Sequence, residues 1–478
     1  MASSKKSLKN STFLSRQANS ESQVSSHPVT PHPLSLQLNQ FLIENIQASH
    51  LTPTLLLALS GGLDSVVLLH LLAEARLSIP FQLHAMHVHH GLSANADSWA
   101  DFCAAQCGKL NVPLQVVHVN VAKNPDYRNS EQGIEAEARQ LRYNALFNYV
   151  VDGKPPEFIV TAHHQDDQAE TLLLQLFRGA GVKGLASMAA LDKVRRLLRP
   201  LLDVSRQALH AYAVQHHLKW GDDESNDNTQ YDRNFVRHEV LPVIQTRFKS
   251  VKAVLARTAG HMAEAGELLE VLARQDAEPL LQNNTLCLQG LSLLSVARVK
   301  NVLRWWFSQN GLAMPAAEHL NEIVDQLLHA KKDSDLNIKL QHLYLRRYRH
   351  RAYLCEAKAP MPFDLVWNGE PELTMPNGGK LLFNQVTGSG LAINLGMTKL
   401  RISNRDGGER FKPDAQRPTR TLKYLLQEIN MPPWQRAYLP LIYWEDKLAF
   451  VPGVGIAHGL AAKSGEPGLE VVWQDSVS

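Results

Sequence analysis

The sequence predicts an α/β protein: a doubly wound, mostly parallel sheet comes first, a mainly helical domain follows, and a small α+β domain ends the chain. Three observations favour this fold class. Short apolar runs alternate with helical patterns near the start of the chain, and polar motifs follow three of these runs. The chain of 478 residues is also too long to form a single hydrophobic core.

The elements of the first domain are predicted from hydrophobic periodicity. Apolar runs short enough for buried strands lie at residues 54–59, 82–88, 114–121 and 158–162. Helical patterns begin at residue 64, cover residues 93–110 and 131–150, and begin again near residue 166. This alternation is typical of a parallel sheet with helices on both faces, which binds ligands outside the carboxyl ends of its strands.

Changes of composition divide the chain further. Residues 1–35 are rich in Ser, Asn, Pro and Lys, so we expect a disordered tail. The first domain then covers residues 36–245, and helical periods followed by strand-like segments place a second domain at residues 246–360. Prolines mark the start of a third domain at residues 361–478, which mixes short strands with a helix that Pro432 and Pro433 end.

Composition indicates the class of protein. Hydrophobic residues make up 44% and charged residues 20% of the chain, as in soluble globular proteins. No stretch is apolar and long enough to span a membrane. The four cysteines form no C-x-x-C pair, which argues against a disulfide framework and favours the cytoplasm. The net charge is only +3, so a polyanionic partner would have to bind local basic patches.

The motif "SGGLDS" at residues 60–65 lies between a predicted strand and a predicted helix. It lacks the lysine of a Walker A loop. Its amides and the Ser60 and Ser65 hydroxyls could enclose a pyrophosphate at the helix N-terminus. The alternative is an ordinary turn in which Asp64 or Ser65 caps the helix.

The motif "HHQDDQAET" places paired histidines and acids where another strand meets a helix. Asp166 and Asp167 could hold Mg²⁺ or a substrate amine, or could simply favour the helix dipole. A binuclear metal phosphohydrolase is a rival interpretation, to which the histidines of "HVHHGLS" would contribute.

Arginines supply the positive charge that a nucleotide would need. Arg139 and Arg142 are three residues apart, so they lie close together on one helix and could clamp a phosphate. A solvent-exposed face with salt bridges is the alternative for this pair.

The motif "SGGLDS" resembles the PP-loop of N-type ATP pyrophosphatases, and the chain as a whole resembles the tRNA(Ile)-lysidine synthetase family. The matching segments are "SGGLDS", "HVHHGLS", "EARQLRY", "TAHHQDDQAET", "RGAGVKGL", "RPLL", "YDRNFVRHEVLP" and, near the C-terminus, "SNRDGGERFKP". They occur in the family's order over most of the chain beyond the tail. Within the second motif, His89 stands where the family often has asparagine.

The resemblance implies a ligase that uses ATP and Mg²⁺. Its substrates would be free L-lysine and the isoleucine tRNA with the CAU anticodon. ATP would adenylate C2 of the wobble cytidine and release pyrophosphate, after which lysine would displace AMP. Residues 36–245 would be the catalytic domain, residues 246–360 would contact tRNA, and residues 361–478 would recognise it. The resemblance also allows a homodimer.

The resemblance assigns the site residues as follows. The catalytic residues would be Asp64, Asp167, Arg139 and Arg142. The ATP-binding residues would be Ser60, Gly61, Gly62, Leu63, Asp64, Ser65, His87, Arg178 and Gly179. The Mg²⁺ ligands would be Asp64, Asp166 and Asp167. The basic residues expected to bind tRNA are Arg233, Arg237, Arg346, Arg347, Arg405, Arg410, Lys412, Arg417, Arg420 and Lys423.

Three other functions are weighed against this one. Another PP-loop tRNA modifier, such as a thiolase, would need reactive cysteines, but Cys103 and Cys107 have a C-x-x-x-C spacing on a predicted outer helix. A His/Asp metal phosphohydrolase leaves "SGGLDS" unexplained. A protein that only binds tRNA leaves three acid-bearing motifs unexplained.

Overall fold

The structure is a computed structural model, and it divides the chain into two compact units, Met1–Gly266 and Glu267–Ser478. It describes residues 31–46, 52–91, 95–120, 131–221, 228–329, 336–356, 361–376, 378–392 and 399–474. Most of the predicted tail, residues 1–30, lies outside the described residues. Helix α1 (Pro33–Ile46) begins before residue 36, because Leu34, Leu38 and Leu42 form a buried stripe at helical spacing.

The first unit contains a six-stranded sheet with the order β3-β2-β1-β4-β6-β5. Its neighbouring strands are parallel except for the pair β5–β6. The strands are β1 (Thr54–Ala58), β2 (Gln82–His89), β3 (Leu114–His118), β4 (Phe158–Val160), β5 (Leu191–Asp192) and β6 (Leu197–Leu198). The doubly wound, mostly parallel sheet that the sequence predicts is therefore present.

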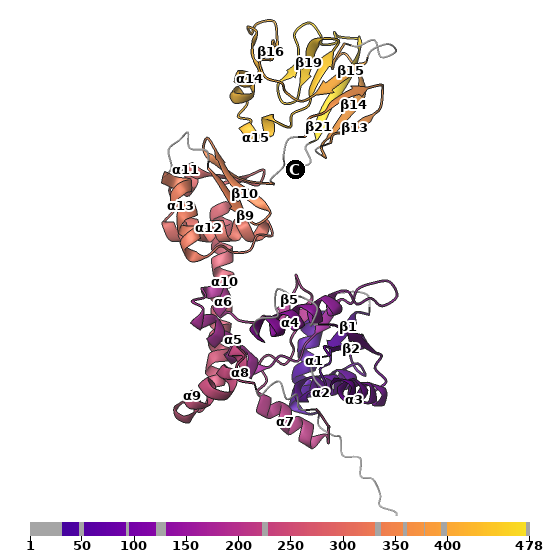
Figure 1. The fold of residues 1–478 in the computed structure, drawn as a ribbon, viewed down its shortest axis with the longest axis vertical. Helices are drawn as coiled ribbons and strands as arrows, with labels where there is room; N and C mark the ends of the chain where they lie inside the picture. Colours follow the sequence, from indigo (N-terminus) through magenta and orange to yellow (C-terminus); the bar gives the residue numbers. More distant parts are fainter. Residues whose placement is uncertain are drawn as a thin grey trace, which may run out of the picture. The chain divides into compact units, whose positions relative to one another are not determined.

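Helices cover both faces of this sheet (Figure 1). Helices α1, α2 (Leu63–Ala75), α3 (Ala96–Lys109) and α7 (Arg206–Gln215) share a core on one face, and α4 (Glu131–Phe147) packs on the other. Helices α5 (Gln165–Phe177) and α6 (Val182–Leu185) follow β4 in the chain and pack against each other. Leu55 and Leu57 of β1 pack in one cluster with α1, α2 and α7, whereas Leu56 packs in another cluster with Leu146 of α4. This alternation follows from the two-residue period of a strand.

The strand order reverses at β1. The chain passes from β1 to β2 and β3 on one side, and then returns to place β4 on the other side of β1. A doubly wound sheet opens a crevice at such a point, outside the carboxyl ends of the two strands. The segments that leave β1 and β4 there are residues 59–62 and 161–164, which carry two of the polar motifs.

The first unit ends in a helical stretch. It comprises α8 (Asp232–Phe235), the π-helical turn η4 (Val236–Val240), α9 (Leu241–Arg247) and the first part of α10 (Val251–Ala277). Val236, Leu241 and Val251 bury their side chains against Leu173 of α5. The stretch is thereby attached to the helix that carries the acidic motif.

The second unit begins with a helical body and an antiparallel sheet of order β7-β8-β11-β10-β9. The strands are β7 (Leu281–Gln282), β8 (Thr285–Cys287), β9 (Asn337–Leu340), β10 (Leu343–Tyr348) and β11 (Arg351–Glu356). The helices are the rest of α10, α11 (Leu288–Leu291), α12 (Val296–Gln309) and α13 (Ala317–His329). Trp306 and Phe307 are fully buried in their shared core.

The C-terminal part of this unit is formed mainly by strands. A five-stranded sheet has the order β12-β15-β18-β19-β20, and smaller sheets have the orders β13-β14-β21 and β16-β17. The strands are β12 (Asp364–Trp367), β13 (Glu372–Thr374), β14 (Lys380–Thr387), β15 (Leu400–Ser403), β16 (Arg410–Phe411), β17 (Arg420–Thr421), β18 (Leu441–Trp444), β19 (Lys447–Val451), β20 (Gly455–Ile456) and β21 (Pro467–Gln474). Helices α14 (Leu422–Glu428) and α15 (Pro433–Arg436) accompany them.

Candidate active site

The loop that joins β1 to α2 contains "SGGLDS". Gly61 has a φ of +88°, a left-handed conformation in which a side chain would be strained. A Cβ atom at Gly61 would also lie 3.1 Å from Cys103 Sγ. Gly62 is the N-cap residue of α2, and no side chain caps the helix from that position. The loop therefore presents a helix N-terminus, which favours an anion.

Two hydroxyl groups line this loop. Ser60 Oγ and Ser65 Oγ are 3.1 Å apart, and the Gly61 amide donates a hydrogen bond to Ser65 Oγ, also at 3.1 Å. The Ser65 hydroxyl donates in turn to the Gly62 carbonyl at 3.0 Å. Ser65 thus stabilises the turn through hydrogen bonds within the loop. The Gly61 amide and the Ser60 and Ser65 hydroxyls, which the sequence predicts to act together, lie next to one another.

His164 lies between two carboxylates at the same edge of the sheet. Its Nε2 is 3.5 Å from Asp64 Oδ2 and 3.5 Å from Asp167 Oδ2. The His164 amide also donates to Asp167 Oδ2 at 2.9 Å, which satisfies an unpaired amide at the start of α5. The strand order therefore brings together acids from two motifs that are a hundred residues apart.

The Oδ1 atom of Asp64 is buried and has no hydrogen-bond partner among the described residues. Burying a carboxylate oxygen without a partner is costly, so the environment favours a cation at this position. Carboxylate oxygens are also the ligands that Mg²⁺ prefers. The residues present here consequently fit a magnesium ion, with Asp64 as the best-placed ligand.

The charges of the site follow from its contacts. Burial disfavours protonated His164, but the hydrogen bond with Asp64 and the charge of Asp167 outweigh this and raise the pKa of His164. Burial alone would raise the pKa of Asp167, yet His164 and Arg233 lower it to about 2. The pKa of His163 falls to about 3, mainly because of burial. The site therefore keeps Asp167 ionised and His163 neutral at neutral pH.

Asp166 points to different partners. Its Oδ2 accepts a hydrogen bond from Lys252 Nζ at 2.6 Å, and its Oδ1 accepts one from the Arg206 amide at 3.3 Å. It therefore connects α5 to the starts of α7 and α10. A magnesium ion at Asp166 would have to compete with the Lys252 ammonium group, so this part of the predicted ligand set gains no support.

Two arginines that the sequence predicts to bind tRNA contact carboxylates of α5 in the structure. Arg233 Nε donates to Glu170 Oε2 at 2.8 Å, and its Nη2 donates to Asp167 Oδ1 at 2.9 Å. Arg237 Nε donates to Glu170 Oε1 at 2.6 Å, and its Nη2 lies 3.3 Å from Asp167 Oδ1. Arg233 and Arg237 are four residues apart, as they must be to face an acidic pair at a spacing of three. This complementary spacing is the sequence signal for the pairing.

Three arginines lie near the same edge, namely Arg139 and Arg142 of α4 and Arg199, which directly follows β6. Arg142 donates to His90 Nε2 at 3.4 Å, and the Arg139 guanidinium lies 5.4 Å from the centre of the Tyr143 ring. Arg199 was not predicted as a site residue, although it begins the segment "RPLL". It is only 6% exposed, and its buried Nε has no partner among the described residues. Arg199 is thus an additional cation near the crevice.

The remaining predicted nucleotide contacts differ in exposure. His87 is buried, and its Nδ1 lies 2.9 Å from the carbonyl oxygen of Leu59, directly before the loop. Burial lowers the pKa of His87. Arg178 is exposed and pairs with Asp232 at 3.7 Å, and Gly179 has a φ of +69°. His87 therefore stabilises the residue that directly precedes the loop, whereas Arg178 is accessible to solvent.

The basic residues of the second unit form two groups. Arg346 lies over the Trp434 ring at 5.3 Å, and Arg405 is paired with Glu409 at 3.3 Å. Lys412 and Arg347 are half-buried. The exposed members are Arg410, Arg417, Arg420 and Lys423. Among these, Arg420 lies 4.5 Å from the centre of the exposed Tyr424 ring, which combines a cation with a stacking surface.

Family comparisons match three segments of the chain. The PP-loop domain matches residues 34–244, the TilS substrate binding domain matches residues 286–353, and the TilS substrate C-terminal domain matches residues 400–473. In the described residues, no helix combines the length and apolar character needed to cross a membrane.

Similar proteins extend over most of the chain. The tRNA(Ile)-lysidine synthase of Nitrosomonas europaea is 40% identical over 88% of this chain and 92% of its own length. The protein of the same name from Coxiella burnetii is 38% identical over 87% and 92%, and that from Serratia proteamaculans is 39% identical over 88% and 95%.

Solved structures are less similar. The U34-tRNA thiolase NcsA from Methanococcus maripaludis has a TM-score of 0.41 and 18% identity, and the match covers 48% of this chain and 78% of that one. A TilS C-terminal domain has a TM-score of 0.21 and 18% identity, and the match covers 24% of this chain and 100% of that one.

Proposed function

Since this chain belongs to the tRNA(Ile)-lysidine synthase family, we propose that its PP-loop crevice joins lysine to the wobble cytidine of an isoleucine tRNA at the expense of ATP. The chain is an enzyme of the ligase type that uses ATP and modifies tRNA. Free L-lysine as the second substrate, the CAU anticodon and Mg²⁺ are the finer parts of the proposal.

The reaction has two steps. The C2 oxygen of cytidine attacks the α-phosphate of ATP, which forms an adenylated base and releases pyrophosphate. The lysine amine then attacks C2, the C2–O bond breaks, and AMP leaves with that oxygen. The amine must lose a proton for this attack. One C–N bond is formed, and the cleavage of ATP to AMP and pyrophosphate drives the sequence.

The loop between β1 and α2 is the proposed pyrophosphate site. The amides at its helix N-terminus provide donors without a Walker lysine, and the exposed Ser60 hydroxyl lies beside them, while Ser65 holds the turn. This single feature carries the proposal, because it suits cleavage between the α- and β-phosphates. Arg139 and Arg142, at the same edge, would stabilise charge on the nucleotide.

Asp64 is the proposed magnesium ligand, because one of its oxygens is buried without a partner. Asp167 is a second ligand in the proposal, although it already contacts His164 and two arginines. Bound Mg²⁺ would neutralise phosphate charge during adenylation. His164, which contacts both acids, positions them relative to each other.

The tRNA contacts are proposed for the exposed cations of the C-terminal part, namely Arg410, Arg417, Arg420 and Lys423. Arg233 and Arg237 are poor candidates because their guanidinium groups already bind Asp167 and Glu170. Phosphate recognition needs cations that solvent can reach.

Two alternatives lose support at particular residues. A thiolase needs a reactive thiol, but Cys103 and Cys107 are buried, and burial raises their pKa values to about 12 and about 11. A phosphohydrolase needs histidines free to bind metal. His87 instead contacts the Leu59 carbonyl, and His89 pairs with Asp97 at 3.0 Å.

The test is an assay with labelled lysine, ATP and a transcript of isoleucine tRNA carrying CAU. We expect label in the tRNA together with equal amounts of AMP and pyrophosphate. A methionine tRNA with the same anticodon is the matched control and should remain unlabelled. Release of ADP in step with labelling, or no labelling at all, would overturn the proposal. Sedimentation of the same preparation tests the homodimer.

A further inference from the structure

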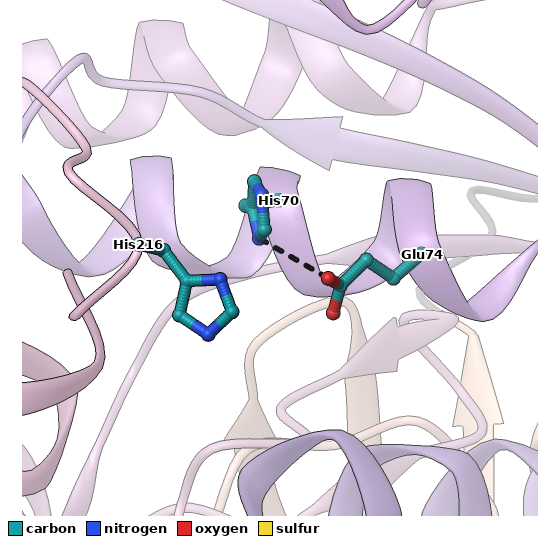
Figure 2. A group of neighbouring side chains, drawn as sticks. All are labelled: His70, Glu74 and His216. Atoms are coloured by element: carbon teal, nitrogen blue, oxygen red, sulfur yellow. Dashed lines mark ion pairs between the residues drawn. The ribbon is translucent and has the colours of Figure 1, made fainter. Parts of the chain in front are cut away.

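A second cluster of ionisable side chains lies along α2, away from the PP-loop crevice. His70 and Glu74 are one helical turn apart on α2, and His216 is the C-cap residue of α7. One ligand atom from each of these three residues lies within 4.8 Å of the other two. Figure 2 shows the His216 ring and the Glu74 carboxylate on either side of His70.

The carboxylate of Glu74 is oriented by its neighbours. Its Oε2 accepts hydrogen bonds from the Tyr212 hydroxyl at 3.1 Å and from the Ser35 hydroxyl at 3.2 Å. Its Oε1 remains on the side of His70, 3.9 Å from Nδ1. Hydrogen bonds of this kind typically orient the ligands of a metal from behind.

The two imidazoles differ in their partners. His70 Nδ1 lies 2.9 Å from the Tyr212 hydroxyl, a contact that a bound cation would replace. His216 Nε2 is buried and has no hydrogen-bond partner among the described residues. The His216 ring stacks on Tyr212 with centroids 4.1 Å apart, so it is held in place without that bond. A coordinated cation, or water bound to it, would supply the missing interaction.

The donor atoms follow from the geometry. His70 Nδ1 and Glu74 Oε1 are 3.9 Å apart, and a ring nitrogen of His216 lies within 4.8 Å of the ligand atoms of both. The Tyr212 hydroxyl can keep its hydrogen bond to Glu74 Oε2 when a cation occupies His70 Nδ1. His70 and His216 are thus the nitrogen donors, and Glu74 is the oxygen donor.

We infer that His70, Glu74 and His216 form a binding site for one divalent transition-metal ion of the zinc class. Two imidazoles and one carboxylate are a donor set that Zn²⁺ accepts, with water in the fourth position. Mg²⁺ and Ca²⁺ prefer oxygen ligands and fit this set poorly. Zinc bonds of about 2.0–2.1 Å place tetrahedral ligand atoms about 3.4 Å apart. The ligand atoms need to approach one another by up to about 1.4 Å, which rotation about side-chain bonds can provide.

The site would connect two segments that meet at the PP-loop. Helix α2 begins directly after that loop, and the chain beyond His216 reaches Gly221, whose amide donates to the Gly61 carbonyl at 3.0 Å. His70 is seven residues beyond Leu63, or about 10 Å along the helix. A bound ion would therefore tie α2 to the end of α7 without touching the crevice, and we expect it to stabilise the first unit.

The experiment uses the full chain without an affinity tag, stripped of metal by a chelator. Calorimetric titration with Zn²⁺ should show one tight equivalent. Titration with Co²⁺ should give the visible absorption of a four-coordinate ion. Zinc at a hundredfold excess over its Kd should raise the unfolding temperature by about 5 °C or more.

The variant His70→Gln/His216→Gln removes both nitrogen ligands, and His261→Gln/His458→Gln removes two exposed histidines as the matched control. We expect the first variant to lose the tight equivalent, with affinity at least tenfold weaker, and the control to retain it. Equal binding by both variants, or an octahedral cobalt spectrum in the unmodified chain, would overturn the inference. If the first variant does not fold, X-ray absorption of the zinc-loaded unmodified chain gives the number of imidazole ligands. Two imidazole ligands support the site, and their absence refutes it.

Discussion

Asp64 differs from the other acids at the crevice in what neutralises it. Lys252 binds Asp166, and Arg233 and Arg237 bind Asp167. Asp64 contacts His164 and keeps a buried oxygen without a hydrogen-bond partner among the described residues. An acid that the protein leaves uncompensated is a candidate for a bound cation. This difference between Asp64 and the pair Asp166 and Asp167 depends on individual side-chain contacts, so the motifs "SGGLDS" and "QDD" do not reveal it.

Asp64→Asn should preserve the fold and reduce adenylation severely, because it removes charge from the proposed magnesium and phosphate site. A loss of about 3 kcal/mol of transition-state stabilisation corresponds to a rate reduction of roughly a hundredfold or more. Pyrophosphate release at saturating Mg²⁺ measures it. Asp203→Asn is the matched control, because Asp203 is exposed on the same unit. Near-normal turnover of the Asp64 variant would reduce this residue to a structural role.

His163 should make the protein sensitive to acid. Its pKa is about 3 in the folded chain against an ordinary value of 6.5, so the unfolded chain binds the proton first as the pH falls. The contribution of neutral His163 to the free energy of unfolding is fully present above pH 6.5. It is lost progressively below that pH, by at most about 2 kcal/mol down to pH 5. Asp167 adds its own loss only below its ordinary pKa of 3.8, as the pH approaches about 2.

Urea denaturation at pH 7 and pH 5 measures this dependence. His163→Asn should flatten it, because the titrating group is gone. His217→Asn is the control, since His217 is exposed and its φ of +52° suits asparagine. An unchanged acid dependence in the His163 variant would contradict the assignment.

At the scale of elements, paired charges fix α5 against the segment formed by α8 and η4. The Glu170 side chain is 1% exposed and accepts hydrogen bonds from both Arg233 and Arg237. The π-helical turn begins at Val236, between the two arginines, and such turns are often found at functional sites. The same contacts orient Asp167, so the stability of this junction and the geometry of the crevice are coupled.

Glu170→Gln should weaken the attachment of α5, because it removes the carboxylate charge that pairs with two partly buried guanidinium groups. A cost of about 3 kcal/mol is expected for breaking such a pair, equivalent to a loss of exchange protection in α5 of roughly a hundredfold. Amide hydrogen exchange in the full chain measures it. Arg178→Gln breaks an exposed pair with Asp232 in the same region and should cost less than about 1 kcal/mol. Equal effects of the two variants would show that the buried pairs do not hold α5.

At the scale of the whole molecule, the C-terminal part has its own hydrophobic cores. Strand β14 pairs with β21, and β12 pairs with β15, so segments from both sides of residue 390 share the same sheets. A cut at that residue would destroy the sheets. A cut after residue 360 leaves the core around Trp306 intact, because that core includes none of the later residues.

Two substitutions test the proposed tRNA surface without a truncation. Arg420→Gln/Lys423→Gln should weaken tRNA binding and reduce the salt slope by about 1.4–1.8, the contribution of two phosphate contacts. Binding measured from low to high salt gives the slope, and ATP binding should be unaffected. Lys447→Gln/Lys463→Gln removes two other exposed lysines of this part and should leave the slope unchanged. Identical slopes for both variants would exclude the predicted surface.

A cut after residue 360 tests the role of the C-terminal part as a whole. The shortened chain should bind ATP and lose discrimination against methionine tRNA, because the anticodon is shared and other nucleotides must be read. Labelling of both tRNAs by the shortened and full chains measures this. Unchanged affinity and selectivity would make the C-terminal part structural only.

The sequence predicted four strands of the first unit, β1 to β4, and the four helices α2 to α5, in their order along the chain. Strands β5 and β6 and helices α6 and α7 were not predicted, and α1 begins within the predicted tail. The predicted strand at residues 54–59 and the observed β1 differ by one residue, and the predicted run at 114–121 ends earlier, at His118. These elements are set by local periodicity and by residues such as Gly61, whose φ excludes most side chains. The motifs that identify the family are also local, so the sequence contains them in full.

Only the tertiary structure decided which polar groups meet. The strand order places Asp64 beside His164 across a hundred residues, and the packing of α8 on α5 pairs Arg233 and Arg237 with buried acids of α5. It also brings His216 to His70 and Glu74. Such contacts join segments that are far apart in the sequence. The hydrophobic periods of helices and strands describe only neighbouring residues, so they carry no information about these contacts.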